Sequence, residues 1–363
     1  MRTKYLDLIA GRRQGLLFDL LRGLLALLSV PYLGVVTARN AYYRLIKSSA
    51  RRLGKPVISI GNITAGGTGK TPVAAHVANM LQQRGRKVAL ILRGYKGRPI
   101  QFDDEQRNWA AERWRKESDE ALVLKRLCPK SRVLVNPDRI AAAGDALATG
   151  ADVLVLDDAF QHRRIARDLD IVLIDATAPF GYGYLLPRGL LREPTRSLQR
   201  ADVVVLTRCN QVDDAARSLL LRRIDRLSGG KPLIQASHRI VGFTDLKGAP
   251  VEVDEPSDMQ AILFAGIGNF GSFRSCAEEL GVHVLAAYEY PDHHDYTAEE
   301  IGGLSNVADT LEANVLLTTE KDAVKLVGRW GEEACRLLVL RLAIEFDADG
   351  DTILAEAVDR VLV

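Results

Sequence analysis

A glycine-rich segment between an apolar strand and a helix constrains the fold of this chain more than any other feature. Residues 56–60 (Pro-Val-Ile-Ser-Ile) predict a short buried strand, and residues 61–71 follow at once as Gly-Asn-Ile-Thr-Ala-Gly-Gly-Thr-Gly-Lys-Thr. A helix is predicted next, with Pro72 tolerated in its first turn, and a second apolar strand is predicted at 87–92. This order of strand, loop and helix is the context that a phosphate-binding P-loop requires.

The loop is predicted to bind the phosphates of a nucleotide. Its glycines let backbone N–H groups surround phosphate oxygens, and the following helix adds the partial positive charge of its N-terminus. We expect Lys70 to bind the β- and γ-phosphates and the Thr71 hydroxyl to bind Mg²⁺. A glycine-rich turn without a ligand is the alternative, and it leaves the lysine unexplained. The predicted nucleotide-binding residues here are Thr64, which replaces the usual first glycine, with Ala65, Gly66, Gly67, Thr68, Gly69, Lys70 and Thr71.

A P-loop needs a further acidic group for its metal ion, usually at the end of a neighbouring apolar strand. The run 153–156 ends in Asp157 and Asp158, and the run 171–174 ends in Asp175. Both runs are continuously apolar, as buried parallel strands are, so either is suitable. Neighbouring carboxylates on an extended chain point in different directions, so one of the two at 157–158 reaches the metal while the other binds water or a side chain. We expect Asp158 to be the one that takes part in the chemistry.

The spacing of apolar runs predicts an α/β protein with a P-loop NTPase-type parallel sheet and a second, smaller α/β domain. Runs that alternate with helical stretches begin near residues 57, 88, 133, 153, 171, 203 and 233, and a second set lies at 262–264, 282–285, 315–318 and 337–340. The domains predicted from this pattern are an N-terminal helical segment (1–54), the P-loop domain (55–235), a two-stranded connector (236–257) and a C-terminal domain (258–363).

The positive charge of the chain is concentrated at its N-terminal end. Residues 1–55 contain eleven Lys or Arg and two Asp, for a net charge of +9, whereas the rest of the chain has a net charge of −6. Nucleic acid is one possible partner for such a patch, but these basic residues flank a leucine-rich stretch. The pattern therefore favours an anionic membrane surface and no nucleic acid.

The N-terminal leucine-rich stretch predicts an amphipathic, membrane-associated helix. Only sixteen residues, 23–38, are free of charge, and Pro31 and Gly34 are expected to interrupt them, so a clean membrane span is not predicted. A helix that packs on the core of the protein is the alternative. A polar stripe (Arg12, Gly15, Asp19, Arg22, Ala26, Ser29) opposes the leucines, and six arginines are expected near lipid headgroups: Arg12, Arg13, Arg39, Arg44, Arg51 and Arg52.

Seven segments, in the same order along the chain, resemble the tetraacyldisaccharide 4′-kinase family. They are residues 61–72, Arg93-Gly94-Tyr95, 157–162 (Asp-Asp-Ala-Phe-Gln-His), 186–194 (Leu-Pro-Arg-Gly-Leu-Leu-Arg-Glu-Pro), 265–270, Asp292-His293-His294 and 319–325. The resemblance spans nearly the whole chain. The chain departs from the family's usual residues at Ser118 and Ala121, which flank Asp119-Glu120, and at Ala159 and Phe270. These differences affect the expected geometry of the local loops, but the charged residues match the family.

The resemblance implies a kinase that uses ATP and Mg²⁺. Its acceptor would be the 4′-hydroxyl of the tetraacyl glucosamine disaccharide 1-phosphate precursor of lipid A. The same resemblance implies two α/β domains, a membrane-associated N-terminal helix and a location on the cytoplasmic face of the bacterial inner membrane. Four cysteines without a CxxC pair fit a reducing cytosol. No obligate protein partner is inferred.

By the same resemblance, Asp119 and His293 form a catalytic pair, with Asp158 and Lys70 as further catalytic residues. Taken alone, Asp119 would be an ordinary carboxylate at a helix N-terminus and His293 part of a polar turn. The resemblance also implies that Tyr95 lies near the nucleotide and that Glu193 joins Thr71 and Asp158 at the metal. The other predicted active-site residues are Asp157, Gln161, His162 and Arg192.

Two other functions remain open from the residues alone. One is a P-loop kinase of a soluble metabolite, which would not need the basic, leucine-rich helix. The other is a nucleotide-dependent metal chaperone or regulatory NTPase. Such chaperones usually carry a Cys or His cluster, and the sequence has none with metal-ligand spacing.

Overall fold

The computed structural model describes residues 2–46, 50–94, 100–101, 118–331 and 335–362. The chain forms two compact units. The first contains Met1–Ile91, Ile140–Ser237 and Glu345–Val363, and the second contains Leu92–Arg139 and His238–Ile344. Each unit therefore combines segments that are far apart in the sequence, which differs from the contiguous domains that the apolar runs suggested.

The first unit is built on a parallel sheet with the glycine-rich loop at its centre. Strand β1 (Val57–Asn62) lies between β5 (Val153–Asp157) and β6 (Leu169–Asp175). The strand order is β8-β7-β6-β1-β5-β2, and each pairing in it is parallel. The predicted P-loop-type sheet is confirmed. The remaining strands are β2 (Val88–Leu92), β7 (Val203–Thr207) and β8 (Leu233–Thr244).

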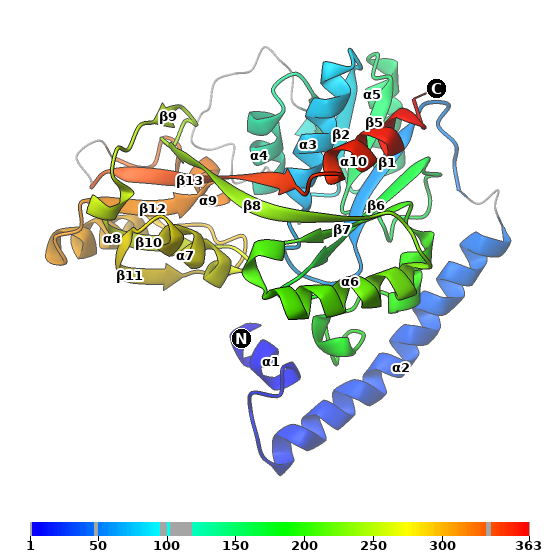
Figure 1. Cartoon of the computed structure of the whole chain (residues 1–363), viewed down its shortest axis with the longest axis horizontal. Helices are drawn as coiled ribbons and strands as arrows, with labels where there is room; N and C mark the ends of the chain where they lie inside the picture. Colours follow the sequence, from blue (N-terminus) through cyan, green and yellow to red (C-terminus); the bar gives the residue numbers. More distant parts are fainter. Residues whose placement is uncertain (1, 47–49, 95–99, 102–117, 332–334, 363) are drawn as a thin grey trace. The chain divides into compact units, whose positions relative to one another are not determined.

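Helices pack on this sheet (Figure 1). Helix α3 (Lys70–Gln83) contacts β1 and β5, and Ile224 of α6 (Asp214–Ser228) packs with Val204 and Leu206 of β7. Every residue of β5, β6 and β7 is buried, so both faces of the sheet are covered. The other helices of this unit are α1 (Arg2–Ile9), α2 (Leu16–Leu45), α5 (Arg139–Ala148) and α10 (Gly350–Asp359).

The second unit contains a smaller parallel sheet in the order β11-β10-β12-β13. Its strands are β10 (Gln260–Ala265), β11 (His283–Glu289), β12 (Val315–Thr319) and β13 (Leu337–Phe346). Two short antiparallel pairings lie outside this order: β9 (Pro250–Val251) pairs with the end of β8, and β3 (Ile100–Gln101) pairs with β4 (Arg132–Val135).

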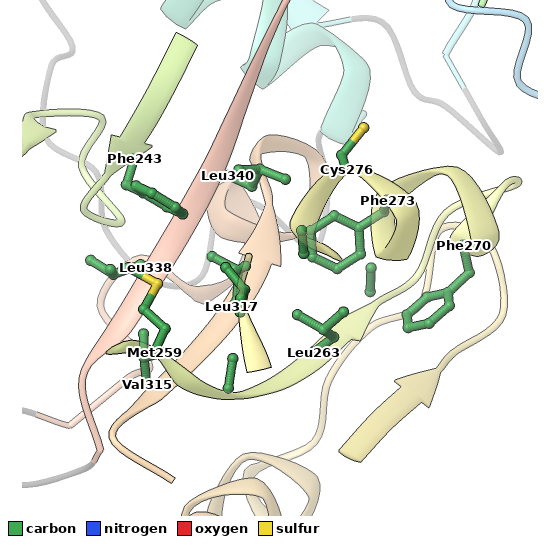
Figure 2. Packing of buried hydrophobic residues seen from close by; sticks show 14 residues of the cluster. Phe243, Met259, Leu263, Phe270, Phe273, Cys276, Val315, Leu317, Leu338 and Leu340 are labelled. Atoms are coloured by element: carbon green, nitrogen blue, oxygen red, sulfur yellow. The ribbon is translucent and has the colours of Figure 1, made fainter. Parts of the chain in front are cut away.

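Alternate residues of these strands point into two different cores. Figure 2 shows one of them, in which Phe273 and Cys276 of α7 (Phe270–Glu279) pack with Leu263, Leu317 and Leu340. The neighbouring residues Phe264 and Leu316 contribute instead to a core with α8 (Ala298–Thr310). This alternation follows from the two-residue period of a strand, and it gives the unit helices on both sides of its sheet.

Helices α4 (Asp119–Leu127) and α9 (Glu320–Leu326) pack against each other within the second unit. Leu122 and Val123 of α4 form a small apolar cluster with Val324 of α9. Each helix begins with acidic residues in its first turn, where the helix dipole favours negative charge. The packing therefore brings the charged starts of two helices together.

Helix α2 continues through Pro31 and Gly34, although these residues were expected to interrupt the helix. That prediction was wrong. A proline inside a helix removes one backbone hydrogen bond and bends the axis, and Ser29 and Tyr32, on either side of Pro31, donate hydrogen bonds to the carbonyls of Leu185 and Arg192. Among the described residues α2 is long and apolar enough to cross a membrane, by length and composition only.

The polar stripe is half-buried or buried at Arg22, Ala26 and Ser29 and exposed at Arg12, Gly15 and Asp19, and the leucines of α2 face outward. Ser29 is buried, and its hydroxyl donates to the carbonyl of Leu185 and accepts from the backbone N–H of Arg188. Leu20, Leu24 and Leu27 are 64%, 53% and 68% exposed. The alternative prediction, in which the apolar face of α2 packs on the core of the protein, therefore does not hold in the described structure.

Candidate active site

The glycine-rich loop connects β1 to α3 and is held in place by hydrogen bonds from polar side chains. The Asn62 side-chain amide donates to the Thr68 hydroxyl at 3.0 Å. From the end of β7, the Thr207 hydroxyl donates to the Thr68 carbonyl at 3.1 Å, and Arg208 donates to the Gly67 carbonyl at 3.1 Å. These bonds hold the carbonyls of Gly67 and Thr68 in place, and the N–H groups of such a loop are the groups that bind phosphate.

Asp175, the second carboxylate that the sequence offered for the metal, supports the loop instead. Its side chain forms a buried ion pair with Arg208, the residue that holds the Gly67 carbonyl, and also accepts from Thr177. The geometry therefore favours Asp157-Asp158 over Asp175 as the acidic partner of the P-loop.

The turn that carries Asp157 and Asp158 lies directly against the start of the loop. A side chain at Gly61 would place its Cβ 2.6 Å from the Cβ of Phe160, so only glycine permits this approach. The Ala159 N–H donates to the Ile60 carbonyl, and the Gln161 side-chain amide donates to the Asn62 carbonyl at 2.8 Å. The predicted site residue Gln161 thus has a clear structural role in joining the two segments.

Asp158 lies between two cations. Its two carboxylate oxygens each accept from Nη1 of Arg192 at 2.9 Å, and Nζ of Lys70 lies 3.6 Å from Oδ1. Asp158 has a φ of 47°, a left-handed conformation that Asp adopts more readily than most residues. The buried Asp157 accepts from the Asp158 N–H at 2.8 Å. The first unit therefore brings together the lysine, the arginine and the carboxylate that the sequence singled out.

Arg192 is held in place by a short stretch of backbone pairing. Its N–H donates to the Ile63 carbonyl, and the Ala65 N–H donates to the Leu190 carbonyl, both at 2.7 Å. The Tyr32 hydroxyl of α2 donates to the Arg192 carbonyl at 3.0 Å. The predicted phosphate-binding arginine is thus connected both to the glycine-rich loop and to the N-terminal helix.

Glu193 is fully buried and has donors on both oxygens. Arg39 donates to Oε1 at 2.9 Å, while Asn40 and Arg200 donate to Oε2 at 2.8 and 2.9 Å. Burial alone would raise the pKa of Glu193, but Arg200, Asn40 and a bond from Ser197 outweigh burial and lower it. The carboxylate therefore anchors α2, and a metal role for Glu193 would require one of these donors to move.

Arg39 was expected near lipid headgroups, but its guanidinium faces the protein and pairs with Glu193. That prediction was wrong. A fully buried carboxylate without a cation is strongly destabilising, so Arg39 pairs with Glu193. The other arginines of the expected set are Arg12, Arg44, Arg51 and Arg52, which are exposed, and Arg13, which is half-buried.

The residues around the loop fit a magnesium ion bound with a nucleotide. Mg²⁺ usually takes one or two protein ligands and completes its shell with phosphate oxygens and waters. Thr71 opens α3 beside Lys70, and Asp158 lies against that same lysine. The residues that the structure describes contain no group of three or more His, Cys, Asp or Glu side chains suited to a metal. The described part of the chain therefore shows no cluster that would bind a metal through protein ligands alone, and its residues fit a metal that is bound together with a nucleotide.

The second unit contains the predicted Asp119–His293 pair. Nδ1 of His293 lies 2.9 Å from both carboxylate oxygens of Asp119. Asp119 is the first residue of α4 and is 8% exposed. Burial alone would raise its pKa, but the hydrogen bond from His293 and the charges of Lys321 and Lys325 lower the pKa of Asp119 to about 2. The carboxylate is therefore ionised at neutral pH.

A close backbone approach places His293. Its N–H donates to the Gly266 carbonyl, and a Cβ on Gly266 would lie 2.9 Å from the Pro291 carbonyl oxygen. His293 itself has a φ of 61°. The neighbouring His294 binds Glu300 instead, with Nε2 at 3.0 Å from Oε2. The geometry thus distinguishes two adjacent histidines that the sequence alone presents as equivalent.

The predicted site residues fall into two groups, one in each unit. In the first unit, His162 is half-buried and its N–H donates to the Ala159 carbonyl. Tyr95 lies outside the described residues. Sequence reasoning missed Asn62, Thr207 and Arg208 beneath the loop, although Thr207 and Arg208 end an apolar run and so lie at the carboxyl edge of a parallel strand, where ligands bind. It gave no contact for Lys321 and did not consider Lys325.

A P-loop sheet with lysine, arginine and carboxylate beside the loop defines a P-loop phosphotransferase. Comparison with known proteins narrows this class. The family model described as tetraacyldisaccharide-1-P 4′-kinase matches residues 21–362. The chain is 38% identical to the tetraacyldisaccharide 4′-kinase of Geobacter metallireducens, over 94% of this chain and 99% of that one. It is 36% identical to the enzyme of the same name from Pelobacter propionicus, over 95% and 94%.

A solved structure gives the same answer. The crystal structure of LpxK from Aquifex aeolicus in complex with ATP superposes with a TM-score of 0.75 at 28% sequence identity, covering 94% of this chain and all of that one. The chain therefore belongs to the tetraacyldisaccharide-1-P 4′-kinase family. It is an enzyme, an ATP-dependent phosphotransferase.

Proposed function

We propose that this chain transfers the γ-phosphate of ATP to the 4′-hydroxyl of the tetraacyl glucosamine disaccharide 1-phosphate precursor of lipid A. Family membership supports the acceptor. The observation that carries the chemistry is the cluster of Lys70, Asp158 and Arg192 beside the glycine-rich loop.

Each residue of this cluster has a role in phosphoryl transfer. Lys70 and Arg192 bind and neutralise the phosphate oxygens, on which negative charge is spread in the transition state. Thr71 and Asp158 are the residues that would hold Mg²⁺, and the ion would offset the negative charge of the phosphates. In the second unit, the Asp119–His293 pair takes the proton of the acceptor hydroxyl.

Replacing Lys70 tests the proposal. Lys70→Ala should reduce transfer from ATP to the lipid disaccharide by roughly 10²-fold or more, because a charge that stabilises the transferring phosphate is lost. Lys87→Ala, at an exposed lysine of the same unit, is the matched control and should be unaffected. Near-normal turnover by folded Lys70→Ala protein would contradict the proposal. Equal turnover of an acceptor that lacks the acyl chains would favour a kinase of a soluble metabolite.

We also propose that the enzyme works on the cytoplasmic side of the inner membrane with α2 at an anionic lipid surface. The outward leucines of α2 and the positive charge of residues 1–55 support this placement. The contacts of Ser29, Tyr32 and Arg39 with residues 185–193 leave the apolar face of α2 available for lipid.

A further inference from the structure

Two segments of the first unit carry positive charge and no acidic residue. Residues 20–56 contain seven Lys or Arg and neither Asp nor Glu, and residues 159–167 contain three Arg and likewise no acid. The second segment directly follows Asp157 and Asp158, and the first acid beyond it, Asp168, accepts from the Val57 N–H at 2.9 Å. A surface on which these segments meet therefore lacks the carboxylates that usually accompany arginines on a protein surface.

Backbone pairing brings the two segments together. Arg51 and Ile165 form an isolated parallel bridge. In it the Arg51 N–H donates to the Arg164 carbonyl at 2.8 Å, and the Ala166 N–H donates to the Arg51 carbonyl at 3.0 Å. Arg51, Arg52 and Arg164 are exposed. Two pairs of adjacent arginines, at 51–52 and 163–164, therefore lie side by side.

The C-terminal end of α2 lies against the second segment. Nη1 of Arg163 donates to the Asn40 carbonyl at 3.0 Å, and its guanidinium carbon lies 5.5 Å from the centre of the Tyr43 ring. Tyr42 packs edge-to-face on Tyr43 and is 50% exposed, and Arg44 lies in the last turn of the same helix. The arginines form a patch beside the end of the helix whose leucines face outward. This arginine patch consists of Arg44, Arg51, Arg52, Arg163 and Arg164.

The arginine patch carries more positive charge than its surroundings offset. Among the described residues, none of its members forms an ion pair with a carboxylate. Glu193 attracts Arg163 but is already bound by Arg39 and Arg200. Burial, together with the charges of Arg200 and Arg167, lowers the pKa of Arg163 to about 10. An anion bound at the patch would offset this repulsion between cations.

We propose that the arginine patch binds the phosphate group of an anionic phospholipid headgroup and so holds the turn that carries Asp157 and Asp158 at the membrane surface. Guanidinium groups match phosphate oxygens, to which they donate paired hydrogen bonds. A lipid is the ligand because the patch adjoins the outward apolar face of α2, and because Tyr42 is an amphipathic side chain of the kind that gathers at membrane interfaces. This inference rests on the proposed location at a lipid surface, and it extends that surface beyond the N-terminal segment.

Substitution of two exposed members of the patch tests the site. Arg52→Gln with Arg164→Gln should weaken binding to phosphatidylcholine vesicles that contain phosphatidylglycerol by about tenfold or more, because each basic residue near an anionic surface contributes a factor of about five. Arg222→Gln with Arg226→Gln, at exposed arginines of α6 in the same unit, changes the charge equally and should bind as wild type. All three proteins should melt at the same temperature without lipid. Equal vesicle binding by the two double variants would overturn the proposal.

Replacement by lysine separates a phosphate site from general attraction to negative charge. Arg52→Lys with Arg164→Lys keeps both charges but loses the paired hydrogen bonds, so vesicle binding should fall by about threefold or more. Wild-type binding by this lysine variant would overturn the headgroup site and leave only diffuse attraction. Failure of the wild type itself to bind these vesicles would overturn the proposed membrane location together with the site.

An assay without phospholipid identifies the source of the phosphate. The proposed lipid disaccharide substrate also carries a phosphate, at its 1-position. In neutral detergent micelles, Arg52→Gln with Arg164→Gln should leave the kcat and the KM for this substrate as in wild type. A raised KM would assign the arginine patch to the substrate's 1-phosphate and would overturn the proposal. Inactivity of the wild-type enzyme toward the disaccharide would contradict the proposed kinase activity, whereas vesicle binding needs no turnover and would stand.

Discussion

Asp158 and His293 both lie on backbone with positive φ. For residues other than glycine this conformation costs about 1–3 kcal/mol, and it persists only where surrounding contacts hold it. The contacts are visible at both positions: Arg192 and Lys70 surround Asp158, and the Gly266 carbonyl holds the His293 N–H. Strain at the residues assigned to the chemistry agrees with their proposed roles.

The Asp119–His293 pair should behave as one unit in kinetics. Asp119→Ala and His293→Ala are each expected to lower kcat, by roughly 10²- to 10⁴-fold, because general acid–base catalysis contributes that much. The double variant should be little worse than the poorer single variant. ATP binding, measured by calorimetry, should survive both changes, because neither residue belongs to the glycine-rich loop. Losses that multiply would indicate independent roles.

Asp119 should also contribute to stability in a defined acid range. Its folded-state pKa of about 2 lies below the unfolded value of 3.8, so it stabilises the fold above pH 3.8 and this contribution is lost as the pH falls toward 2. The difference in melting temperature between wild type and Asp119→Asn should therefore be constant above about pH 5 and shrink below pH 4. A difference that does not change down to pH 2.5 would contradict the assigned ion pairs.

Single residues differed greatly in how well the sequence predicted them. Lys70 and Thr71 follow from a local motif, because the loop places them whatever the rest of the chain does. Asp119 and His293 lie 174 positions apart, and only the resemblance joined them. Arg208 was missed because its partners come from distant parts of the sequence, Gly67 from the glycine-rich loop and Asp175 from the end of β6.

At the scale of elements, α2 shows how a helix can serve a membrane and a site at once. Its residues Tyr32 and Arg39 bind the segment that carries Arg192 and Glu193, while its leucines face outward. The sequence predicted the stripe opposite the leucines but placed Arg39 near lipid headgroups, because helical period shows which residues share a face and not what that face contacts.

The contact between α2 and Glu193 predicts a measurable loss of stability when the Asn40 side chain is shortened to alanine. Asn40→Ala removes one of the two donors to Oε2 of a fully buried carboxylate, so unfolding should become easier by about 1.5–3 kcal/mol, as is typical for a lost hydrogen bond to a charged group. The kcat should fall as well, because Arg192 is adjacent in the chain. Arg44→Ala, at an exposed arginine on the same helix, is the control. Equal melting temperatures for the two variants would mean that the Asn40 contact does not matter in solution.

The strands illustrate the opposite case. The seven apolar runs that begin between residues 57 and 233 and the four that follow them became strands, because continuous apolar runs suit parallel sheets covered on both faces. The short β3, of two residues, has no such signal. An apolar pattern predicts a strand only when the strand is long enough to show that pattern over several residues.

At the scale of the whole molecule, the chain enters and leaves each unit more than once. The apolar runs alternate with helical stretches on both sides of these returns, and this is why contiguous domains were predicted. The uneven charge, in contrast, is readable from the sequence, because net charge adds along a segment whatever its fold.

The charge and the outward leucines together predict salt-dependent binding to anionic vesicles. Each basic residue near such a surface contributes about 1 kcal/mol, and this attraction is screened within about 8 Å at physiological salt. Leu20→Gln, Leu24→Gln and Leu27→Gln combined should reduce co-sedimentation at least tenfold, because each leucine loses about 1.5–3 kcal/mol of burial in lipid. These side chains are exposed, so the melting temperature in the absence of lipid should stay unchanged.

A control separates this surface from general stickiness. Leu219→Gln with Leu311→Gln removes exposed leucines outside α2 and should leave vesicle binding as in wild type. Neutral vesicles should bind the wild type more weakly than anionic ones, and high salt should remove that difference. The apparent KM for substrate embedded in vesicles should rise in the triple variant, while a short-chain soluble acceptor should be used as before. Equal sedimentation of wild type and triple variant on anionic lipid at low salt would exclude the leucine face as a membrane surface.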